Sequence, residues 1–186
     1  MKTKRLPTII AGVIAAAVIT LLVLNFTTGE KRVREQVQHQ YDVADPQFLR
    51  AMGVLLGPPL LEGNRVTTLL NGDQIFPAML QAIRSAQKTI TFETYIYWSG
   101  AIGKEFSEAL ADRAKNGVRV HVTLDWLGSQ KMEEQQIEAM RKAGVEVHKY
   151  HPPHWYTLNR FNNRTHRKLL VVDGKTGFTG GVGIAD

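Results

Sequence analysis

The 186-residue sequence contains no cysteine, which excludes a disulfide framework, a thiolate metal site and a cysteine nucleophile. Net positive charge is also small over most of the chain. Residues 1–35 carry six basic and two acidic side chains, and the remaining 151 residues carry 17 basic and 15 acidic ones, only +2 of the total +6. A domain that binds nucleic acid would carry the excess on its own surface. We therefore expect no nucleic-acid partner.

Charge is absent altogether from residues 6–26, LPTIIAGVIAAAVITLLVLNF, a run of 21 residues. As a helix this run would be about 30 Å long, the thickness of the hydrocarbon core of a bilayer. A cleaved signal peptide is the alternative, but the run exceeds a usual apolar core and NFTTGEKR offers no small-x-small cleavage site. We predict an N-terminal anchor over residues 1–29 and a single-pass membrane protein. Three basic residues on each side leave its orientation open.

Two further regions follow this anchor. Residues 30–62 are polar and interrupted by GPPLLEG, which indicates a linker with a short helix near residues 47–56. In residues 63–186, strand patterns alternate with helical ones, which predicts right-handed crossovers and an α/β layered sheet flanked by helices. The expected strands are 66–70, 88–98, 118–126, 145–150, 168–172 and 176–178, and the expected helices are one capped by Asp73, 103–116 and 131–143.

The stretch HRKLLVVDG, residues 166–174, places polar side chains at both ends of an apolar run. In a strand, residues two apart point to the same face, so His166 and Lys168 would project together while Leu169 faces the other way. A strand that enters from a polar loop often begins with polar residues, so the pair alone is also compatible with a purely structural strand edge. The complete pattern is His166-x-Lys168-x4-Asp173, followed by GKTGFTGG.

This pattern resembles the HKD motif, the signature of the phospholipase D superfamily. The longer string NNRTHRKLLVVDGKTGFTGGVGIAD is similar to bacterial cardiolipin synthases and their phospholipase D-like relatives. FETYIYW, HVTLDWLGSQKM and AGVEVHKYH occur in the order seen in that family, so the resemblance runs from about residue 65 to the end. It implies a phospholipase D-like fold, a bacterial cell membrane as location, an anionic phospholipid substrate, and no metal or other cofactor.

The resemblance also implies roles for the three motif residues. His166 would be the nucleophile, since a neutral imidazole can attack phosphorus and form a phosphohistidine. Lys168 would bind the non-bridging oxygens of the phosphate as a point charge. Asp173 would orient an imidazole and stabilise its charged forms.

Members of this family usually carry two such motifs that meet across one site, and the second histidine acts as general acid and base. His121, His148, His151 and His154 each lack the lysine or the aspartate at the required spacing. We therefore expect a fragment, the anchor and first half of a longer synthase, which would be inactive as a monomer. The alternative is a one-motif protein that completes its site as a homodimer.

Other residues are weaker candidates. The loop HPPHWYTLNRFNNR interleaves aromatic and basic residues, as at a lipid-headgroup surface, although a solvated basic loop would look the same. The spacing of His148, His151 and His154 invites a metal site, but no acidic ligand pattern accompanies them. Gly183 stands where the family often has asparagine, which puts one phosphate contact in doubt. The remaining substrate-binding candidates are Arg164, Gly180, Gly181, Glu93 and Tyr95, and for the last two an exposed strand face is the alternative.

The sequence thus predicts phosphatidyl transfer of the cardiolipin synthase type, in which two phosphatidylglycerol molecules give cardiolipin and glycerol. Hydrolysis by a phospholipase or phosphodiesterase remains an alternative, because the choice of acceptor depends on how the site excludes water. A non-catalytic membrane-bound binding module is the alternative from another class. The side of the membrane that bears the domain stays open.

Overall fold

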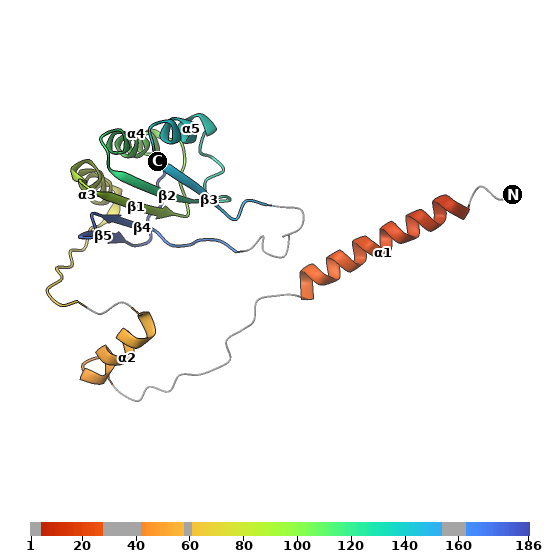
Figure 1. Cartoon of the computed structure of the whole chain (residues 1–186), viewed down its shortest axis with the longest axis horizontal. Helices are drawn as coiled ribbons and strands as arrows, with labels where there is room; N and C mark the ends of the chain where they lie inside the picture. Colours follow the sequence, from red (N-terminus) through yellow and green to blue (C-terminus); the bar gives the residue numbers. More distant parts are fainter. Residues whose placement is uncertain (1–4, 28–41, 58–60, 154–162) are drawn as a thin grey trace. The chain divides into compact units, whose positions relative to one another are not determined.

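The computed structural model describes residues 5–27, 42–57, 61–153 and 163–186. The sheet and the helices that pack on it belong to Leu69–Asp186, while the segment Gly29–Thr68 is a separate unit. Figure 1 shows the N-terminal helix, this segment and the sheet domain.

The N-terminal helix α1 covers Arg5–Thr27. Its 23 residues correspond to a length of about 35 Å. Within it, Pro7–Leu24 has a mean hydropathy of 2.5 and no buried residue, so the helix is long and apolar enough to cross a membrane. The predicted apolar run is therefore a continuous helix.

The segment before the sheet contains α2, Pro46–Leu56, where the sequence predicts a short helix. Asp45 caps it by accepting a 2.7 Å hydrogen bond from the backbone N–H of Gln47, and Gly57, at φ +80°, ends it. The strand expected at residues 66–70 is wrong. This stretch pairs with no strand in the described residues, and Val66 is 90% exposed, so no partner stabilises an extended ladder there.

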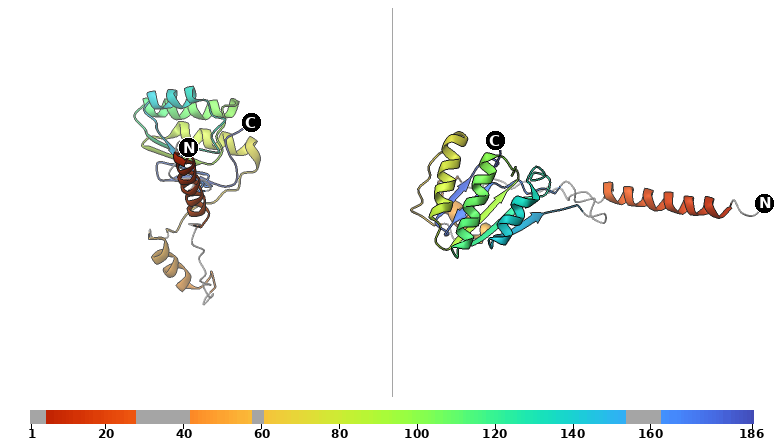
Figure 2. Two further views of the ribbon diagram at one scale, coloured as in Figure 1. Left: turned by 90° about the vertical axis from the view of Figure 1, so that its right-hand side faces the viewer. Right: turned by 90° about the horizontal axis from the view of Figure 1, so that it is seen from above.

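The domain itself is a five-stranded sheet in the order β3-β2-β1-β4-β5. The first three strands along the chain are parallel to one another, whereas β4 is antiparallel to both β1 and β5. Figures 1 and 2 show α3, α4 and α5 together on one face of the sheet. The strands are β1 (Thr89–Thr94), β2 (Arg119–Asp125), β3 (Glu146–Tyr150), β4 (Leu169–Val172) and β5 (Thr176–Thr179), and the helices are α3 (Asn71–Ser85), α4 (Ala101–Lys115) and α5 (Glu134–Lys142).

Strand alternation forms the core between the sheet and these helices. Ile90 and Phe92 of β1 and Leu170 of β4 point to the helices and are at most 2% exposed. Phe106 of α4 packs its ring 6.0 Å from that of Phe92. Each such side chain contributes about 1.5–3 kcal/mol by leaving water, so this layer is what fixes the sheet and its edges. The predicted α/β sheet flanked by helices is confirmed.

Two local predictions fail in physically clear ways. The strand expected over residues 88–98 ends at Thr94, and Tyr97 turns into the core beyond it. Its hydroxyl lies 2.9 Å from the carbonyl of Gly103, to which it donates, and burial raises its pKa above the ordinary 10. Helix α3 begins at Asn71 rather than after an Asp73 cap, and the side chain of Gln74 accepts from the backbone N–H of Leu70.

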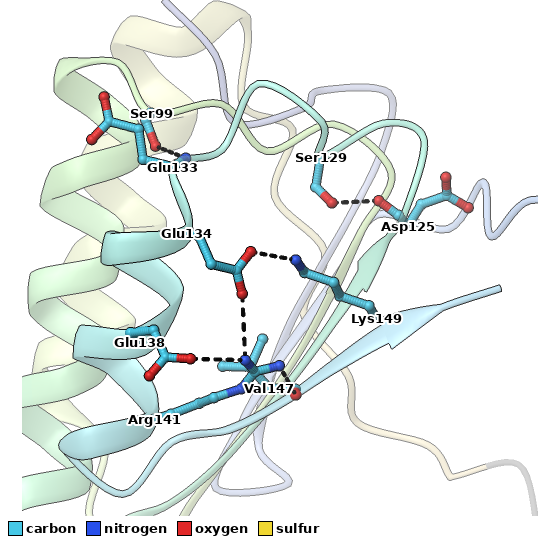
Figure 3. Close-up of polar contacts among 9 residues, drawn as sticks. All are labelled: Ser99, Asp125, Ser129, Glu133, Glu134, Glu138, Arg141, Val147 and Lys149. Atoms are coloured by element: carbon cyan, nitrogen blue, oxygen red, sulfur yellow. Dashed lines mark hydrogen bonds and ion pairs between the residues drawn. The ribbon is translucent and has the colours of Figure 1, made fainter. Parts of the chain in front are cut away.

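Polar contacts fasten α5 to the sheet (Figure 3). The ammonium of Lys149 in β3 donates to Glu134 at 2.6 Å, which lowers the pKa of that carboxyl group. Arg141 lies between Glu134 and Glu138, at 3.6 and 3.5 Å. The helix is shorter than the predicted 131–143, because the turn after β2 continues to residue 131 and α5 begins only at Glu134.

Candidate active site

Four chain segments meet at one edge of the sheet. This edge is the one formed by the ends of the strands, and not the side of an outer strand. Strands β1 and β2 are parallel and end there, at Thr94 and Asp125, while β4 runs the other way and begins there. Strand β5 ends at the same edge, because its Thr179 pairs with Leu169 of β4. The carboxyl ends of parallel strands are where α/β sheets place their ligands.

His166 and Lys168 lie at this edge, in the segment immediately before β4. Both contact Tyr95, which follows β1: the rings of Tyr95 and His166 are 5.2 Å apart, and Lys168 Nζ is 5.4 Å from the centre of the Tyr95 ring. Lys168 Nζ also donates to the carbonyl of His166 at 3.1 Å. His166 is exposed and Lys168 is half-buried, so an imidazole and an ammonium are presented together to solvent.

The residues on either side of His166 turn to a different partner. The Thr165 hydroxyl donates to Glu93 Oε1, and Arg167 Nε lies 3.1 Å from the same oxygen. Glu93 is mostly covered, with 13% of its side chain exposed, although Arg167 itself is exposed. The structure therefore gives Glu93, a predicted substrate contact, partners within the chain.

Asp125 lies at the end of β2 and is completely buried. Its Oδ1 accepts from the N–H groups of Leu127 and Gly128, at 2.9 and 3.2 Å, and its Oδ2 accepts from the N–H of Thr165 at 3.0 Å. Arg164 Nη1 lies 3.6 Å from Oδ1. Arg164, also predicted to bind substrate, thus directs its guanidinium to a buried carboxylate (Asp125 is drawn in Figure 3).

Asp173 lies at the opposite edge of the sheet. Asp173 follows His166 by seven positions that include all of β4, which corresponds to about 20 Å. Its carboxylate accepts backbone hydrogen bonds from Gln87, Lys88 and Thr89, at 2.9, 2.7 and 2.9 Å, and these bonds hold its pKa below the ordinary value of 3.8. Within the described part of the chain, Asp173 therefore stabilises the start of β1 and does not reach His166.

The glycines after β5 lie at the His166 edge. Gly180 and Gly181 are exposed, and a Cβ on either would meet no atom within 4 Å, so a ligand could approach their backbone. Gly183 is different, because its Cβ would lie 2.6 Å from Cβ of Ile96. Close packing explains why a glycine stands where the family often has asparagine.

This edge presents groups that can bind an anion and attack an electrophile. Lys168 and Arg167 add positive charge beside an exposed imidazole. No group of three or more histidine, aspartate or glutamate side chains in the described residues is arranged to hold a metal ion. Most of the predicted lipid-facing loop, residues 151–164, lies outside the described residues. His154 lies outside them as well.

The sequence of this domain matches a known family. A sequence model described as "Cardiolipin synthase, PLD-like domain" matches residues 79–186, more than half of the chain. The chain belongs to this family. The match includes all five strands and every residue of the candidate active site described above. The resemblance to phospholipase D-like proteins that the motif indicated is therefore confirmed.

Cardiolipin synthases are also the curated relatives. Cardiolipin synthase A of Pseudomonas fluorescens strain Pf-5 is 38% identical over 140 residues, which cover 74% of this chain and 29% of that protein. Cardiolipin synthase 1 of Bacillus anthracis is 39% identical over 132 residues, which cover 70% of this chain and 26% of that protein. The chain therefore spans less than a third of the length of these relatives.

Among solved structures, Nuc of Salmonella typhimurium, a phospholipase D family member, aligns over 60% of this chain and 66% of its own. The TM-score of that alignment is 0.47 and the identity 22%. NucT of Helicobacter pylori aligns over 59% and 66%, with a TM-score of 0.47 and 16% identity.

Two residues of this edge were missed from the sequence. Thr165 was not singled out, although its position next to His166 requires it to face the other side of an extended chain. Asp125 lies in the predicted strand 118–126 and accepts hydrogen bonds from the turn that follows, a local role that its sequence position suggests. Its second partner, the backbone of Thr165, is 40 residues away and leaves no local sequence signal.

Proposed function

We propose that this domain supplies the nucleophile half of a phosphatidyl-transfer site of the cardiolipin synthase type. The observation that supports the proposal most directly is the position of His166 and Lys168. They lie side by side and accessible, at the edge where the parallel strands of a phospholipase D-like sheet end.

In the proposed reaction, a nitrogen of the neutral His166 imidazole attacks the phosphorus of one phosphatidylglycerol. A phosphorus–nitrogen bond forms, and the bond from phosphorus to the headgroup glycerol breaks. The leaving oxygen takes a proton from a general acid, so free glycerol departs and the phosphatidyl group remains on the ring. A hydroxyl of a second phosphatidylglycerol, deprotonated by the same group acting as base, then attacks phosphorus. Cardiolipin forms and His166 is released.

Lys168 provides the electrostatic part of this mechanism. A phosphodiester is an anion, and charge on its non-bridging oxygens opposes attack unless it is neutralised. The ammonium of Lys168 already lies beside the His166 backbone, 3.1 Å from its carbonyl oxygen. A small rotation of this flexible side chain would place it on the phosphate without displacing the nucleophile.

The general acid is not among the residues placed at this edge. We propose that it comes from a second motif of the same kind, either in further residues of a longer protein or in a second copy of this chain. Two motifs facing each other would also place four cationic or imidazole groups around one phosphate. The partner in the reaction would be phosphatidylglycerol in the bilayer.

We also propose that α1 anchors the domain in the bacterial cell membrane, as its length and apolar composition allow. The protein should then remain in the pellet when membranes are washed with sodium carbonate. Deletion of residues 1–28 should move it to the supernatant. Recovery of the complete chain in the soluble fraction would contradict the anchor.

The reaction is tested by lipid analysis. The intact gene is expressed in a bacterial strain without its own cardiolipin synthase, and lipids are measured by mass spectrometry with His166→Asn as the inactive control. Cardiolipin together with free glycerol supports transfer. Phosphatidic acid in place of cardiolipin would indicate hydrolysis, and an unchanged lipid profile would favour the binding module. Expression of the 186-residue chain alone then distinguishes a homodimer, which should be active, from a site that needs further residues.

A further inference from the structure

Thr165 is held by two carboxylates that the proposed chemistry does not use. Its backbone N–H donates to Asp125 and its hydroxyl donates to Glu93. Thr165 is 5% exposed and Asp125 is fully buried, so both bonds lie largely out of water, where charge-assisted hydrogen bonds are strong. Because Thr165 directly precedes His166, these bonds fix the backbone from which the imidazole projects.

Glu93 determines the direction in which His166 points. The same carboxylate oxygen contacts Thr165 and Arg167, the residues on either side of the histidine. The side chains alternate between two partners, because His166 and Lys168 both contact Tyr95 instead. When both neighbours turn to Glu93, His166 must face the other way, where its ring meets that of Tyr95.

Asp125 joins this arrangement to the turn after β2. Its Oδ1 binds the N–H groups of Leu127 and Gly128, while its Oδ2 binds Thr165. The turn packs tightly on Tyr95, since a Cβ at Gly128 would lie 1.9 Å from the Tyr95 carbonyl oxygen. The turn, Tyr95 and the segment before His166 therefore form one packed unit, with Asp125 at its centre.

We infer that Glu93 and Asp125 form a clasp on Thr165 that positions His166 for attack on phosphorus. The three are positioning residues, and the inference rests on the proposed function because it takes His166 as the nucleophile. A displacement of about 1 Å at a reacting atom can reduce a rate on the order of 100-fold. Removing one arm of the clasp should therefore slow chemistry more than it weakens substrate binding.

The test compares Thr165→Val, which keeps the size of the side chain and removes its hydroxyl, with Thr165→Ser, which keeps the hydroxyl. In protein from the intact gene, the valine variant should lower kcat roughly 10- to 100-fold while KM stays within about twofold. The serine variant should restore kcat to within about threefold of the wild type. Thr91→Val, an exposed position on the same face of β1 as Glu93, is the matched control and should change neither constant.

A second readout does not depend on turnover. In the 186-residue chain labelled with ¹³C-histidine and held in detergent, the ring signal of His166 is assigned by its absence from His166→Asn. The nearby Tyr95 ring should shift this signal away from that of an exposed histidine. Thr165→Val should move it back, whereas Thr165→Ser and Thr91→Val should leave it in place.

The outcomes separate the two proposals. An unmoved His166 signal and an unchanged kcat in Thr165→Val would overturn the clasp. If the wild type transfers no lipid, the proposed function fails, and the NMR signal alone decides whether the clasp exists. If thermal unfolding shows that Thr165→Val is unfolded, Glu93→Ala removes the same arm from the other partner, and the same displacement of the His166 signal is expected.

Discussion

The two ends of β4 carry the two ends of one sequence motif, and their surroundings differ sharply. Before the strand, His166 is exposed and Lys168 is half-buried, and both contact the ring of Tyr95. After the strand, Asp173 accepts three backbone hydrogen bonds from Gln87, Lys88 and Thr89. The first end has groups free to meet a ligand, while the second uses its carboxylate to join β4 to the start of β1.

This difference shows that spacing in a motif does not by itself imply a shared site. An extended chain separates His166 and Asp173 by about 20 Å, which no side chain can span. Only the end near the carboxyl termini of β1 and β2 lies where α/β sheets bind ligands. We therefore propose that His166 and Lys168 carry the chemistry, whereas Asp173 stabilises the framework of the sheet.

The largest loss of transfer activity is expected from Lys168→Ala, a change at the exposed end of the motif. Loss of the ammonium leaves the phosphate charge unneutralised during attack, and transfer activity should fall roughly 100- to 1000-fold. The fold should survive, because the side chain lies at an open edge, beside the Tyr95 ring and the His166 carbonyl. Activity per folded protein and the unfolding temperature are measured together. A variant that keeps most of its activity would remove Lys168 from the mechanism.

Asp173→Asn should lower stability and leave activity nearly unchanged, the reverse of the effect expected from Lys168→Ala. Asp173 has φ of +53°, which asparagine tolerates, so this change tests the charge without adding backbone strain. Its amide group would face backbone donors, and the unfolding temperature should fall by about 5 °C. Folded protein should keep its activity within about threefold. An inactive variant of unchanged stability would show that Asp173 takes part in catalysis after all.

The wild type and Asp173→Asn should also differ in how their unfolding temperatures depend on pH. Hydrogen bonds from Thr89, Gln87 and Lys88 hold the pKa of Asp173 below its ordinary value of 3.8. A carboxyl group with a lowered folded-state pKa stabilises the fold above its unfolded-state pKa, and this contribution is lost as the pH falls through the folded-state value. The difference in unfolding temperature between the wild type and Asp173→Asn should therefore be full above about pH 5 and shrink below about pH 4. A difference that does not change with pH would contradict this role.

The smallest effect is expected from Tyr95→Leu. Leucine keeps apolar bulk beside the pair but removes the aromatic face, and an exposed contact between a cation and such a face contributes about 0.5–1 kcal/mol. Activity should fall roughly two- to fivefold, with little change in stability. A loss as large as that of Lys168→Ala would assign Tyr95 a direct part in the reaction.

Local patterns in the sequence predicted much of the fold. Helical spacing and strand alternation located three helices and five strands, because a layered α/β domain repeats simple periods. The expected strand at residues 66–70 failed because a β-type pattern needs a partner strand, and none is present in the described residues. The strand expected up to residue 98 was too long, because Tyr97 packs into the core and its hydroxyl bonds to Gly103 of α4, which strand periodicity does not indicate.

The site was predictable only where its residues are neighbours in the chain. His166 and Lys168 were found together because strand geometry alone relates positions two apart. The contacts of Thr165 with Glu93 and Asp125 span 72 and 40 residues and depend on β4 running antiparallel to β1, which no local pattern indicates. For the same reason, the role of Asp173 at the start of β1 became visible only in three dimensions.

The central claim is that phosphatidyl transfer passes through His166, while Asp173 serves the framework. The most direct measurement is to trap the covalent intermediate: protein from the intact gene is mixed with phosphatidylglycerol labelled with ³²P, quenched, and digested. An acid-labile label should appear on the peptide that contains His166, in the wild type and in folded Asp173→Asn, and should be absent from His166→Asn. Label that persists in His166→Asn, or that is lost from well-folded Asp173→Asn, would contradict this division of roles.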